Sequence, residues 1–304
     1  MSAVIDTRDL TKFYGQHLGV EGLDLEVQEG EVFGYLGPNG AGKTTTIRLL
    51  LDFIRPTRGR ARVLGLDAQR DSVEIRRHLG YLPGELALYG NLRGMQLLRF
   101  LAHLRGGVDW AYVDALAERF ELDITRRVRE YSRGNKQKLG IIQAFMHRPR
   151  LLVLDEPTVG LDPFMQQEFY RLVKEVQAAG STVFFSSHIL PEVERVCTRV
   201  GIIRNGSLVE VQDIATMKER ALRQIEFRFA GPIAPGDLDR VPGVTEVVYD
   251  GRSVCFTVQG RVDAVIKAAA AYTVEQVISH EVSLEAIFMA YYEDGAAKPP
   301  PPGQ

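Results

Sequence analysis

The stretch GPNGAGKTTT, residues 37–46, decides the fold of this chain. Between Gly37 and Thr44 it satisfies the pattern G-x-x-x-x-G-K-[ST], which is typical of loops that bind phosphate groups. The segment EVFGYL at 31–36 has the pattern of a strand, and TTIRLLLDF at 45–53 has the pattern of a helix. A strand, a glycine-rich loop and a helix in this order predict a nucleotide site, rather than an ordinary glycine-rich turn.

Each residue type in this loop has an expected role. The glycines allow backbone N–H groups to surround phosphates, and the helix N-terminus adds roughly half a positive charge. Lys43 is expected to reach the β- and γ-phosphates, Thr44 to offer its hydroxyl to Mg²⁺, and Thr45 to reach the α-phosphate. The residues predicted to bind the nucleotide are Gly37, Pro38, Asn39, Gly40, Ala41, Gly42, Lys43, Thr44 and Thr45.

A second stretch, LLVLDEP at 151–157, carries the acidic residues that such a site needs. An apolar strand delivers Asp155 and Glu156 at its carboxyl end, where ligands gather in open α/β sheets. Asp155 is expected to hold Mg²⁺ through water. Adjacent side chains of an extended segment point in opposite directions, so Glu156 is predicted to act instead as the general base on the attacking water.

Short strands alternate with helices through the first two-thirds of the chain. LDLEVQ at 23–28 alternates apolar and polar residues, and TVFFSS at 182–187 is apolar or small throughout, as in a strand covered on both faces. A helical insert at about 88–145 is predicted to contain two amphipathic helices. Their apolar residues at helical spacing are Leu97, Leu101, Leu104, Val113, Leu116 and Phe120.

The pattern changes after the predicted hairpin turn Asn205-Gly206, and a second unit begins near residue 220. We expect a nucleotide-binding domain at 1–220 and a small α+β domain at 221–292, with a hairpin turn at Asp250-Gly251 and a helix within VDAVIKAAAAY. The proline-rich segment 293–304 is predicted to be disordered.

Composition limits the function classes. The 304 residues are 45% hydrophobic and carry a net charge of −2, so there is no basic excess of the kind that marks nucleic-acid binders. The cysteines Cys197 and Cys255 have neither disulfide-framework nor zinc-ligand spacing. We find neither a signal sequence nor an apolar run near the ~20 residues of a membrane span. The sequence therefore predicts a cytosolic protein that does not bind nucleic acid.

The block YSRGNKQKLGIIQAFMHRPRLLVLDEPTVGLDP, residues 131–163, resembles the corresponding block of ATP-binding cassette (ABC) ATPases. The resemblance covers residues 3 to about 217. It implies an α/β P-loop ABC ATPase domain, with a mixed β-sheet core and a helical subdomain, that hydrolyses ATP with Mg²⁺. It also implies a homodimer in which Ser132 and Gly134 contact the γ-phosphate of the partner's ATP and Asp162 links the two sites.

Two further residues take their expected roles from the same resemblance. Tyr14, in KFYGQ, matches the aromatic residue that stacks on adenine. His188, which follows the serines of SSH, matches the residue that binds the γ-phosphate as a switch. Taken alone, Tyr14 is more often a packing residue and His188 a polar surface or core residue, and it is their order and spacing relative to the two phosphate motifs that favours the functional roles.

The chain departs from the family pattern in two places. The usual Leu-Ser-Gly-Gly-Gln is Tyr131-Ser132-Arg133-Gly134-Asn135 here, which resembles a subset of bacterial export-type ATPases. In GYLPGELALY, residues 80–89, Gly84 replaces the glutamine that senses the nucleotide. We expect the segment Tyr81–Tyr89 to contact a separate membrane permease. The sensing role is lost at Gly84 or passes to a water molecule or to Glu85, while catalysis is retained by Lys43, Thr44, Asp155 and Glu156.

The sequence thus predicts the ATPase subunit of an exporter for drugs, antibiotics or related small molecules, peripheral on the inner face of the cell membrane. Three alternative functions compete with this prediction. A GTPase is disfavoured because NKQK at 135–138 ends in Lys138, which cannot accept guanine N–H groups. A soluble ABC ATPase without a transport role usually has two cassettes or a coiled-coil insert. A nucleotide-gated binding module is favoured by Gly84 and disfavoured by Glu156. The cargo and the role of the second domain are not encoded in recognisable motifs.

Overall fold

The computed structural model describes residues 3–220, 222–234, 236, 238–259 and 262–281. The chain divides into two compact units, Met1–Gln212 and Asp213–Gln304, each described by itself below. The segment predicted to be disordered, 293–304, lies outside the described residues. Among the helices within those ranges, we find none with the length and apolar character needed to cross a bilayer.

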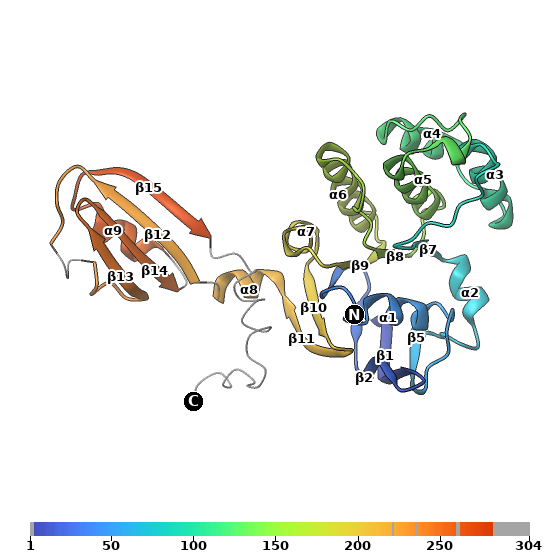
Figure 1. Cartoon of the computed structure of the whole chain (residues 1–304), viewed down its shortest axis with the longest axis horizontal. Coiled ribbons are helices and arrows are strands. Elements are labelled where there is room, and N and C mark those ends of the chain that lie inside the picture. The colour runs from blue at the N-terminus through green and yellow to red at the C-terminus, as the bar shows by residue number, and fades with distance from the viewer. Residues whose placement is uncertain (1–2, 221, 235, 237, 260–261, 282–304) are drawn as a thin grey trace. The chain divides into compact units, whose positions relative to one another are not determined.

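A six-stranded sheet forms the centre of the first unit (Figure 1). Its strands are β4 (Val32–Leu36), β7 (Leu79–Leu82), β8 (Leu151–Asp155), β9 (Thr182–Ser187), β10 (Arg199–Arg204) and β11 (Ser207–Asp213). They lie in the order β11-β10-β4-β9-β8-β7, and the five strands from β10 to β7 are parallel. Every residue of β4, β8 and β9 is buried, which confirms the expectation of strands covered on both faces.

The hairpin between β10 and β11 turns at Asn205-Gly206, as the sequence predicts. Both turn residues have positive φ, 48° and 81°, which is the backbone conformation that a two-residue hairpin loop favours.

A second sheet of the first unit is antiparallel. It consists of β1 (Ala3–Tyr14), β2 (His17–Leu23), β3 (Glu26–Gln28), β5 (Arg58–Val63) and β6 (Leu66–Asp67). The predicted alternation in LDLEVQ is confirmed, because Leu23, Leu25 and Val27 are all buried. The expected single strand is nevertheless divided, since Leu23 pairs with Leu10 and Val27 pairs with Ile5 in two separate ladders on β1.

Four helices complete the body of the first unit: α1 (Lys43–Leu50), α2 (Ser72–Arg77), α6 (Pro163–Ala178) and α7 (Leu190–Val196). Helix α1 contacts β2 and β5 of the antiparallel sheet as well as β8 of the parallel sheet. The core under α1 contains the aromatic rings of Phe33, Tyr35 and Phe184. The Phe184 ring centroid lies 5.9 Å from that of Phe33 and 5.2 Å from that of Tyr35. This core holds the two sheets together.

The helical insert consists of α3 (Gly94–Leu104), α4 (Trp110–Arg119), the single 3₁₀ turn η1 (Val128–Glu130) and α5 (Arg133–Phe145). Figure 1 shows α3, α4 and α5 gathered in one group. Val113, Leu116 and Phe120 are buried, as expected of an amphipathic α4. The expectation for α3 is wrong at Leu104, which is 66% exposed because it is the last residue of that helix, beyond the turns that pack on α5.

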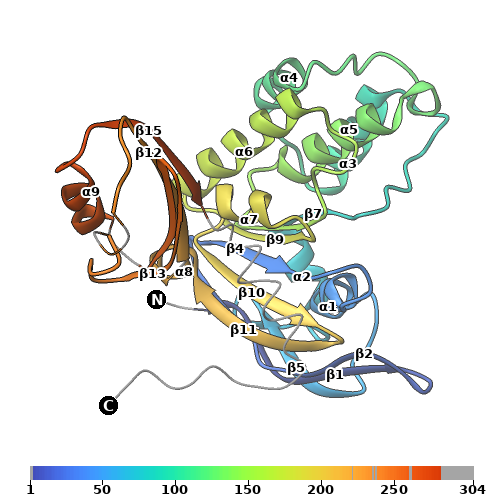
Figure 2. The ribbon, with the colours of Figure 1, turned by 60° about the vertical axis from the view of Figure 1, so that its left-hand side comes forward.

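The second unit contains α8 (Ile214–Arg220), β12 (Leu222–Phe229), β13 (Val244–Asp250), β14 (Ser253–Gln259), α9 (Asp263–Ala269) and β15 (Val274–Glu281). Its strands form an antiparallel sheet in the order β13-β14-β12-β15, and α9 packs beside that sheet (Figure 2). The predicted hairpin between β13 and β14 is present, but its turn is Gly251-Arg252, one residue later than expected, because Asp250 still pairs with Ser253.

Candidate nucleotide-binding and catalytic site

The candidate site lies where four neighbouring parallel strands end. In the sheet, Leu36 at the end of β4 pairs with Ser187 of β9, and Asp155 at the end of β8 pairs with Ser186. Leu82 at the end of β7 pairs with Leu154. The loops that follow these strands therefore emerge side by side along one edge of the sheet, which is where ligands bind in open α/β folds.

The phosphate loop follows β4 and leads directly into α1. Gly42 has φ 112°, and a Cβ on it would lie 2.8 Å from the carbonyl oxygen of Gly19. A Cβ on Gly37 would lie 2.5 Å from the carbonyl oxygen of Ile203. Both positions therefore require glycine. The first turn of α1 has no acidic residue, which leaves its positive end available to an anion.

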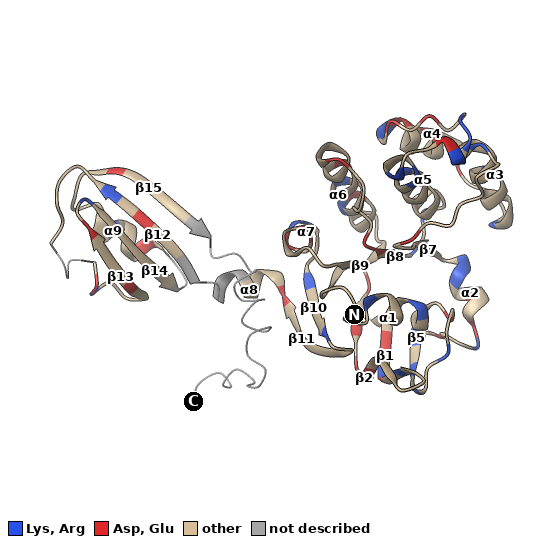
Figure 3. Ribbon diagram, viewed as in Figure 1, with Lys and Arg blue, Asp and Glu red and all other residues tan. Residues whose placement is uncertain are grey.

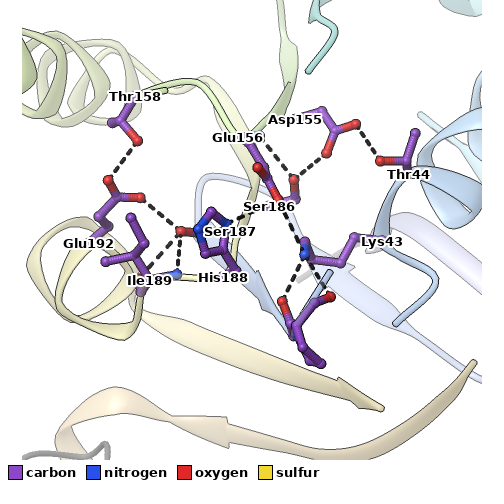
Figure 4. Close-up of polar contacts among 12 residues, drawn as sticks. Lys43, Thr44, Asp155, Glu156, Thr158, Ser186, Ser187, His188, Ile189 and Glu192 are labelled. Carbon is purple, nitrogen blue, oxygen red and sulfur yellow. Dashed lines mark hydrogen bonds and ion pairs between the residues drawn. The ribbon is translucent and has the colours of Figure 1, made fainter. Parts of the chain in front are cut away.

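Lys43 is held inside this loop (Figure 4). Its side chain is only 5% exposed, and its Nζ donates to the carbonyl oxygens of Gly37, at 2.7 Å, and Pro38, at 3.1 Å. The same Nζ lies 3.3 Å from Oε1 of Glu156. The ammonium group is thus directed into the curve of the loop, toward the position that phosphates take in sites of this kind.

Asp155 and Thr44 form an oxygen-rich pair across the site. Thr44 Oγ1 donates to Asp155 Oδ2 at 2.8 Å, and Ser186 Oγ donates to Asp155 Oδ1 at 2.6 Å. Asp155 is 2% exposed and meets no lysine or arginine in these contacts. Carboxylate and hydroxyl oxygens are the ligands that Mg²⁺ prefers, so the residues present fit this ion. Ser186, which fixes the carboxylate, was not singled out by the sequence, because in TVFFSS it reads only as a small buried residue.

Glu156 lies at the centre of the polar cluster in Figure 4. Its backbone has φ 48°. Its N–H donates to two oxygens of Ser186, the carbonyl oxygen at 3.2 Å and Oγ at 3.1 Å. Because the chain leaves the extended conformation here, the carboxylate turns toward Lys43 and His188. His188 Nδ1 lies 3.2 Å from Glu156 Oε1. The structure thus brings together all three residues predicted to be catalytic, Lys43, Glu156 and His188.

Tyr14 lies beside the phosphate loop. A Cβ on Gly19 would lie 2.9 Å from Tyr14 Cε2 and 3.1 Å from Thr45 Cγ2, so the Tyr14 ring and the Thr45 side chain both lie close to Gly19. The ring is 42% exposed, and Lys12 Nζ lies 5.5 Å from its centroid. An exposed aromatic face next to a phosphate loop suits the stacking of a base.

The residues predicted to act in trans lie at two helix starts. Ser132 and Asp162 precede α5 and α6, and Gly134 lies close to the turn after β8. Ser132 Oγ accepts from Asn135 N at 3.2 Å and caps α5, while Asp162 Oδ1 accepts from Met165 N at 3.0 Å and caps α6. A Cβ on Gly134 would lie 2.8 Å from the carbonyl oxygen of Gly160. Ser132 and Asp162 are exposed. Their predicted role opposite a second copy of the chain stays a prediction.

Gln137 also belongs to this region, although the sequence reasoning did not single it out. It is 6% exposed, and its Nε2 donates to the carbonyl oxygen of Pro157 at 2.7 Å. The bond joins α5 to Pro157, the residue after Glu156. The helix that contains part of the motif Tyr131–Asn135 therefore also supports the turn that begins at Glu156.

Gly84 follows β7 and lies next to Asp155. A Cβ on Gly84 would lie 3.5 Å from Asp155 Oδ2, which is ordinary van der Waals contact, so the position can accept a side chain. Glu85 beside it is exposed. Tyr81 lies in β7, three residues before Gly84. Burial raises the pKa of Tyr81 to about 12, and the negative charge of Asp155 contributes to this increase. The negative charge of Asp155 thus acts on Tyr81 in β7, although burial is the larger cause of the raised pKa.

Charged residues elsewhere on the ribbon are mixed in sign. Figure 3 shows Lys and Arg interspersed with Asp and Glu along the elements of both units. Several of them pair, for example Arg119 of α4 with Glu168 and Glu175 of α6.

Comparison with known proteins bears directly on this site. Residues 20–159 match the family model described as ABC transporter. The chain is 40% identical over 233 residues to the bacitracin transport ATP-binding protein BcrA of Bacillus licheniformis, covering 76% of each protein. It is 34% identical over 213 residues to the linearmycin resistance ATP-binding protein LnrL of Bacillus subtilis (strain 168), covering 68% of each. A solved ATP-binding subunit of an ABC transporter matches with a TM-score of 0.66 and 29% identity, over 71% of this chain and 92% of that chain. The resemblance inferred from residues 131–163 is confirmed.

Proposed function

The chain belongs to the ABC transporter family as an ATP-binding protein, and we propose that it hydrolyses ATP to drive a separate membrane permease that exports an antibiotic or a related small molecule. The observation that carries the proposal is the convergence of Lys43 and His188 on Oε1 of Glu156, beside the Thr44–Asp155 pair. Phosphoryl transfer depends mainly on positioning and electrostatic stabilisation, and these residues supply both.

In the proposed reaction, Lys43 exchanges its contacts with Gly37, Pro38 and Glu156 for contacts with the β- and γ-phosphates of ATP. Thr44 and Asp155 would hold Mg²⁺, which when bound neutralises charge that develops on the phosphates. Freed from Lys43, Glu156 accepts the proton of the attacking water. His188, whose Nδ1 already meets Glu156, orients that carboxylate and reaches the γ-phosphate.

We further propose that two copies of the chain enclose two ATP molecules. Ser132 and Gly134 of one copy would then meet the γ-phosphate bound by the other, and Asp162 would connect the two sites. The exposure of Ser132 and Asp162 at the starts of α5 and α6 supports this assignment. The N-terminus of α5, a helix of 13 residues with no acidic residue in its first turn, is electrostatically suited to an anion.

The partner and cargo are proposed from position and relationship. The segment Tyr81–Tyr89 begins with the last two residues of β7 at the site. It includes Tyr89, which is 63% exposed, so it can transmit nucleotide binding to a permease at the inner face of the membrane. BcrA and LnrL are named for bacitracin transport and linearmycin resistance, which supports antibiotic export as the cargo class. The cassette itself would remain in the cytoplasm.

An affinity pull-down from detergent-solubilised native membranes, followed by mass spectrometry, tests the transporter assignment. We expect a stoichiometric multi-span membrane protein to be recovered with the tagged chain. Recovery of ribosomal proteins or of DNA-bound complexes would instead support a soluble ABC ATPase without a transport role.

A nucleotide-gated binding module with weak hydrolysis is a second candidate, because Gly84 provides no side chain beside Asp155. Steady-state turnover of the purified chain separates the two functions. Hydrolysis that is lost when Glu156 is replaced by glutamine supports the ATPase, whereas ATP binding without turnover supports the module.

A further inference from the structure

A buried carboxylate, that of Glu192, joins the turn after Glu156 to the end of β9, which precedes His188. Glu192, in the first turn of α7, is 6% exposed. Its Oε1 accepts from Thr158 Oγ1 at 2.6 Å, and its Oε2 accepts from Ser187 Oγ at 2.8 Å (Figure 4). Thr158 and Ser187 are themselves 3% and 2% exposed. Water therefore does not compete for these bonds, and burying a carboxylate in this way is favourable only when it is well hydrogen-bonded.

Each hydroxyl lies within two residues of a side chain that we assign to catalysis. Thr158 lies two residues after Glu156, in a turn closed by the bond from Val159 N to the Glu156 carbonyl oxygen at 3.3 Å. Ser187 immediately precedes His188, and its Oγ also accepts from Ile189 N at 2.9 Å. Glu192 thus fixes the backbone on both sides of the contact between Glu156 and His188.

Helix α7 provides a rigid base for this carboxylate. A Cβ on Gly34 of β4 would lie 2.5 Å from Val193 Cγ1 and 3.0 Å from Cys197 Sγ, so the helix approaches the strand more closely than any side chain would allow. Val193 is fully buried against the sheet. The position of Glu192 is therefore tied to the strand that leads into the phosphate loop.

Hydrogen bonds from the hydroxyls of Thr158 and Ser187 hold the Glu192 carboxylate in place. Burial raises the pKa of Tyr170, and the nearby Glu192 carboxylate raises it further, so the phenol stays protonated beside that carboxylate. The guanidinium of Arg195 lies 5.4 Å from the Tyr170 ring centroid. A neutral hydroxyl environment of this kind holds a carboxylate by directional hydrogen bonds, and direction is what a positioning role needs.

We propose that Glu192 is a positioning residue that sets Glu156 and His188 in register through the hydroxyls of Thr158 and Ser187. It touches neither the phosphate loop nor the Thr44–Asp155 pair, so it acts on turnover and leaves ATP binding intact. The inference rests on the proposed ATP hydrolysis and does not depend on the permease or its cargo.

The test compares Glu192→Ala with Glu192→Gln in the purified full-length chain. The alanine variant is expected to lower kcat by about 10- to 100-fold, the scale on which a misplaced catalytic group slows a reaction, with an unchanged Kd for ATP. The glutamine variant should retain most of the wild-type kcat. Its amide oxygen can accept from Thr158, and its NH₂ can donate to Ser187, whose hydroxyl can turn to the Ile189 carbonyl oxygen 3.4 Å away.

Thr158→Val and Thr158→Ser form a matched pair that does not disturb the buried carboxylate itself. Valine should lower kcat and serine should restore it, since only serine keeps the hydroxyl that Glu192 holds. This pair decides the matter even if Glu192→Ala fails to fold.

Two results would overturn the inference: wild-type kcat in both Glu192→Ala and Thr158→Val, or parallel losses of kcat, ATP affinity and melting temperature, which indicate a merely structural role. A wild-type chain that hydrolyses no ATP would count against the proposed function instead, so the two failures can be told apart.

Discussion

Lys43 Nζ and Glu156 Oε1 lie 3.3 Å apart, so the group that should bind phosphate is paired with the group that should activate water. We expect this ion pair to open when Lys43 contacts the phosphates of ATP, because the three donors of the ammonium group are already directed at Gly37, Pro38 and Glu156. Nucleotide binding is therefore expected to release the Glu156 carboxylate for catalysis, which links occupancy of the phosphate loop to the readiness of the base.

Replacing Glu156 with glutamine should lower kcat by about 10²- to 10⁴-fold, the range for removal of a general base. ATP binding should be retained or become tighter, because the neutral amide no longer competes for Lys43. Turnover and ATP affinity are measured on the same preparations. Glu118→Gln, at an exposed position of α4, is the matched control and should behave as the wild type. Equal turnover in Glu156→Gln would remove Glu156 from the role of base.

Replacing Lys43 with alanine should weaken ATP binding by roughly 10- to 100-fold, because hydrogen bonds between charged groups contribute about 1.5–3 kcal/mol. Titration with a fluorescent ATP analogue measures the change. Binding that is as tight as in the wild type would show that the ammonium group, now held by Gly37 and Pro38, does not move to the phosphates.

Gly84→Gln tests the departure at the end of β7. The new Cβ would meet Asp155 Oδ2 at 3.5 Å without a clash, so the variant should fold and place an amide beside Asp155, which we propose as a Mg²⁺ ligand. We expect faster ATP hydrolysis and half-saturation at a lower Mg²⁺ concentration. Gly84→Ala, which adds the Cβ without the amide, should change neither. Unchanged rates and Mg²⁺ dependence in the glutamine variant would argue that the missing side chain has no bearing on turnover.

Gly134→Ala should disturb the conformation of the motif Tyr131–Asn135 by a steric clash alone. Its Cβ would lie 2.8 Å from the Gly160 carbonyl oxygen, so either α5 or the turn that leads to Asp162 must shift. Overpacking of this kind costs about 1–3 kcal/mol. We expect turnover to fall while ATP binding by Lys43 and Thr44 is preserved. Gly231→Ala is the control, because a Cβ there meets no atom within 4 Å. Full activity in Gly134→Ala would contradict a tight contact at Gly160.

His147 should make stability depend on pH. Its Nε2 lies 3.1 Å from the Leu79 carbonyl oxygen, and burial, with a smaller effect from Arg105, lowers its pKa from 6.5 to about 4. Because the folded state resists protonation, the unfolded state binds more protons between these values. The free energy of unfolding should therefore fall as the pH drops from about 6.5 to about 4, with no contribution from His147 above that range.

Thermal unfolding of the wild type and of His147→Gln at about pH 7.5 and about pH 5 checks this prediction. The glutamine variant should lose less stability on acidification. Identical losses in the two proteins would assign the acid sensitivity to other groups.

The sequence was most informative where a local pattern has one structural solution. The order of strand, loop and helix around Lys43, and the apolar strand before Asp155, each required a particular geometry, and both segments have it. The hairpin at Asn205-Gly206 is of the same kind, since both of its residues tolerate positive φ.

The sequence was less informative where tertiary contacts decide. Ser186, Gln137 and Glu192 carry no motif, and their roles arise only because β9, α5 and α7 bring them to Asp155, Pro157 and Thr158. Local turn preference predicts a turn at Asp250-Gly251. The turn is instead Gly251-Arg252, because the cross-strand pairing of Asp250 with Ser253 outweighs that preference. No periodicity in a single segment reveals partners of this kind.

The positive φ of Glu156 has a consequence for how this protein would respond to selection. A left-handed backbone costs about 1–2 kcal/mol for a residue with a Cβ, and glycine is free of that strain. A library randomised at position 156 and screened only for heat resistance should therefore drift toward glycine, whereas one screened for ATP turnover should keep glutamate. At position 156, glycine favours stability whereas glutamate favours activity. Efforts to raise the thermal stability of this chain should therefore leave Glu156 unchanged.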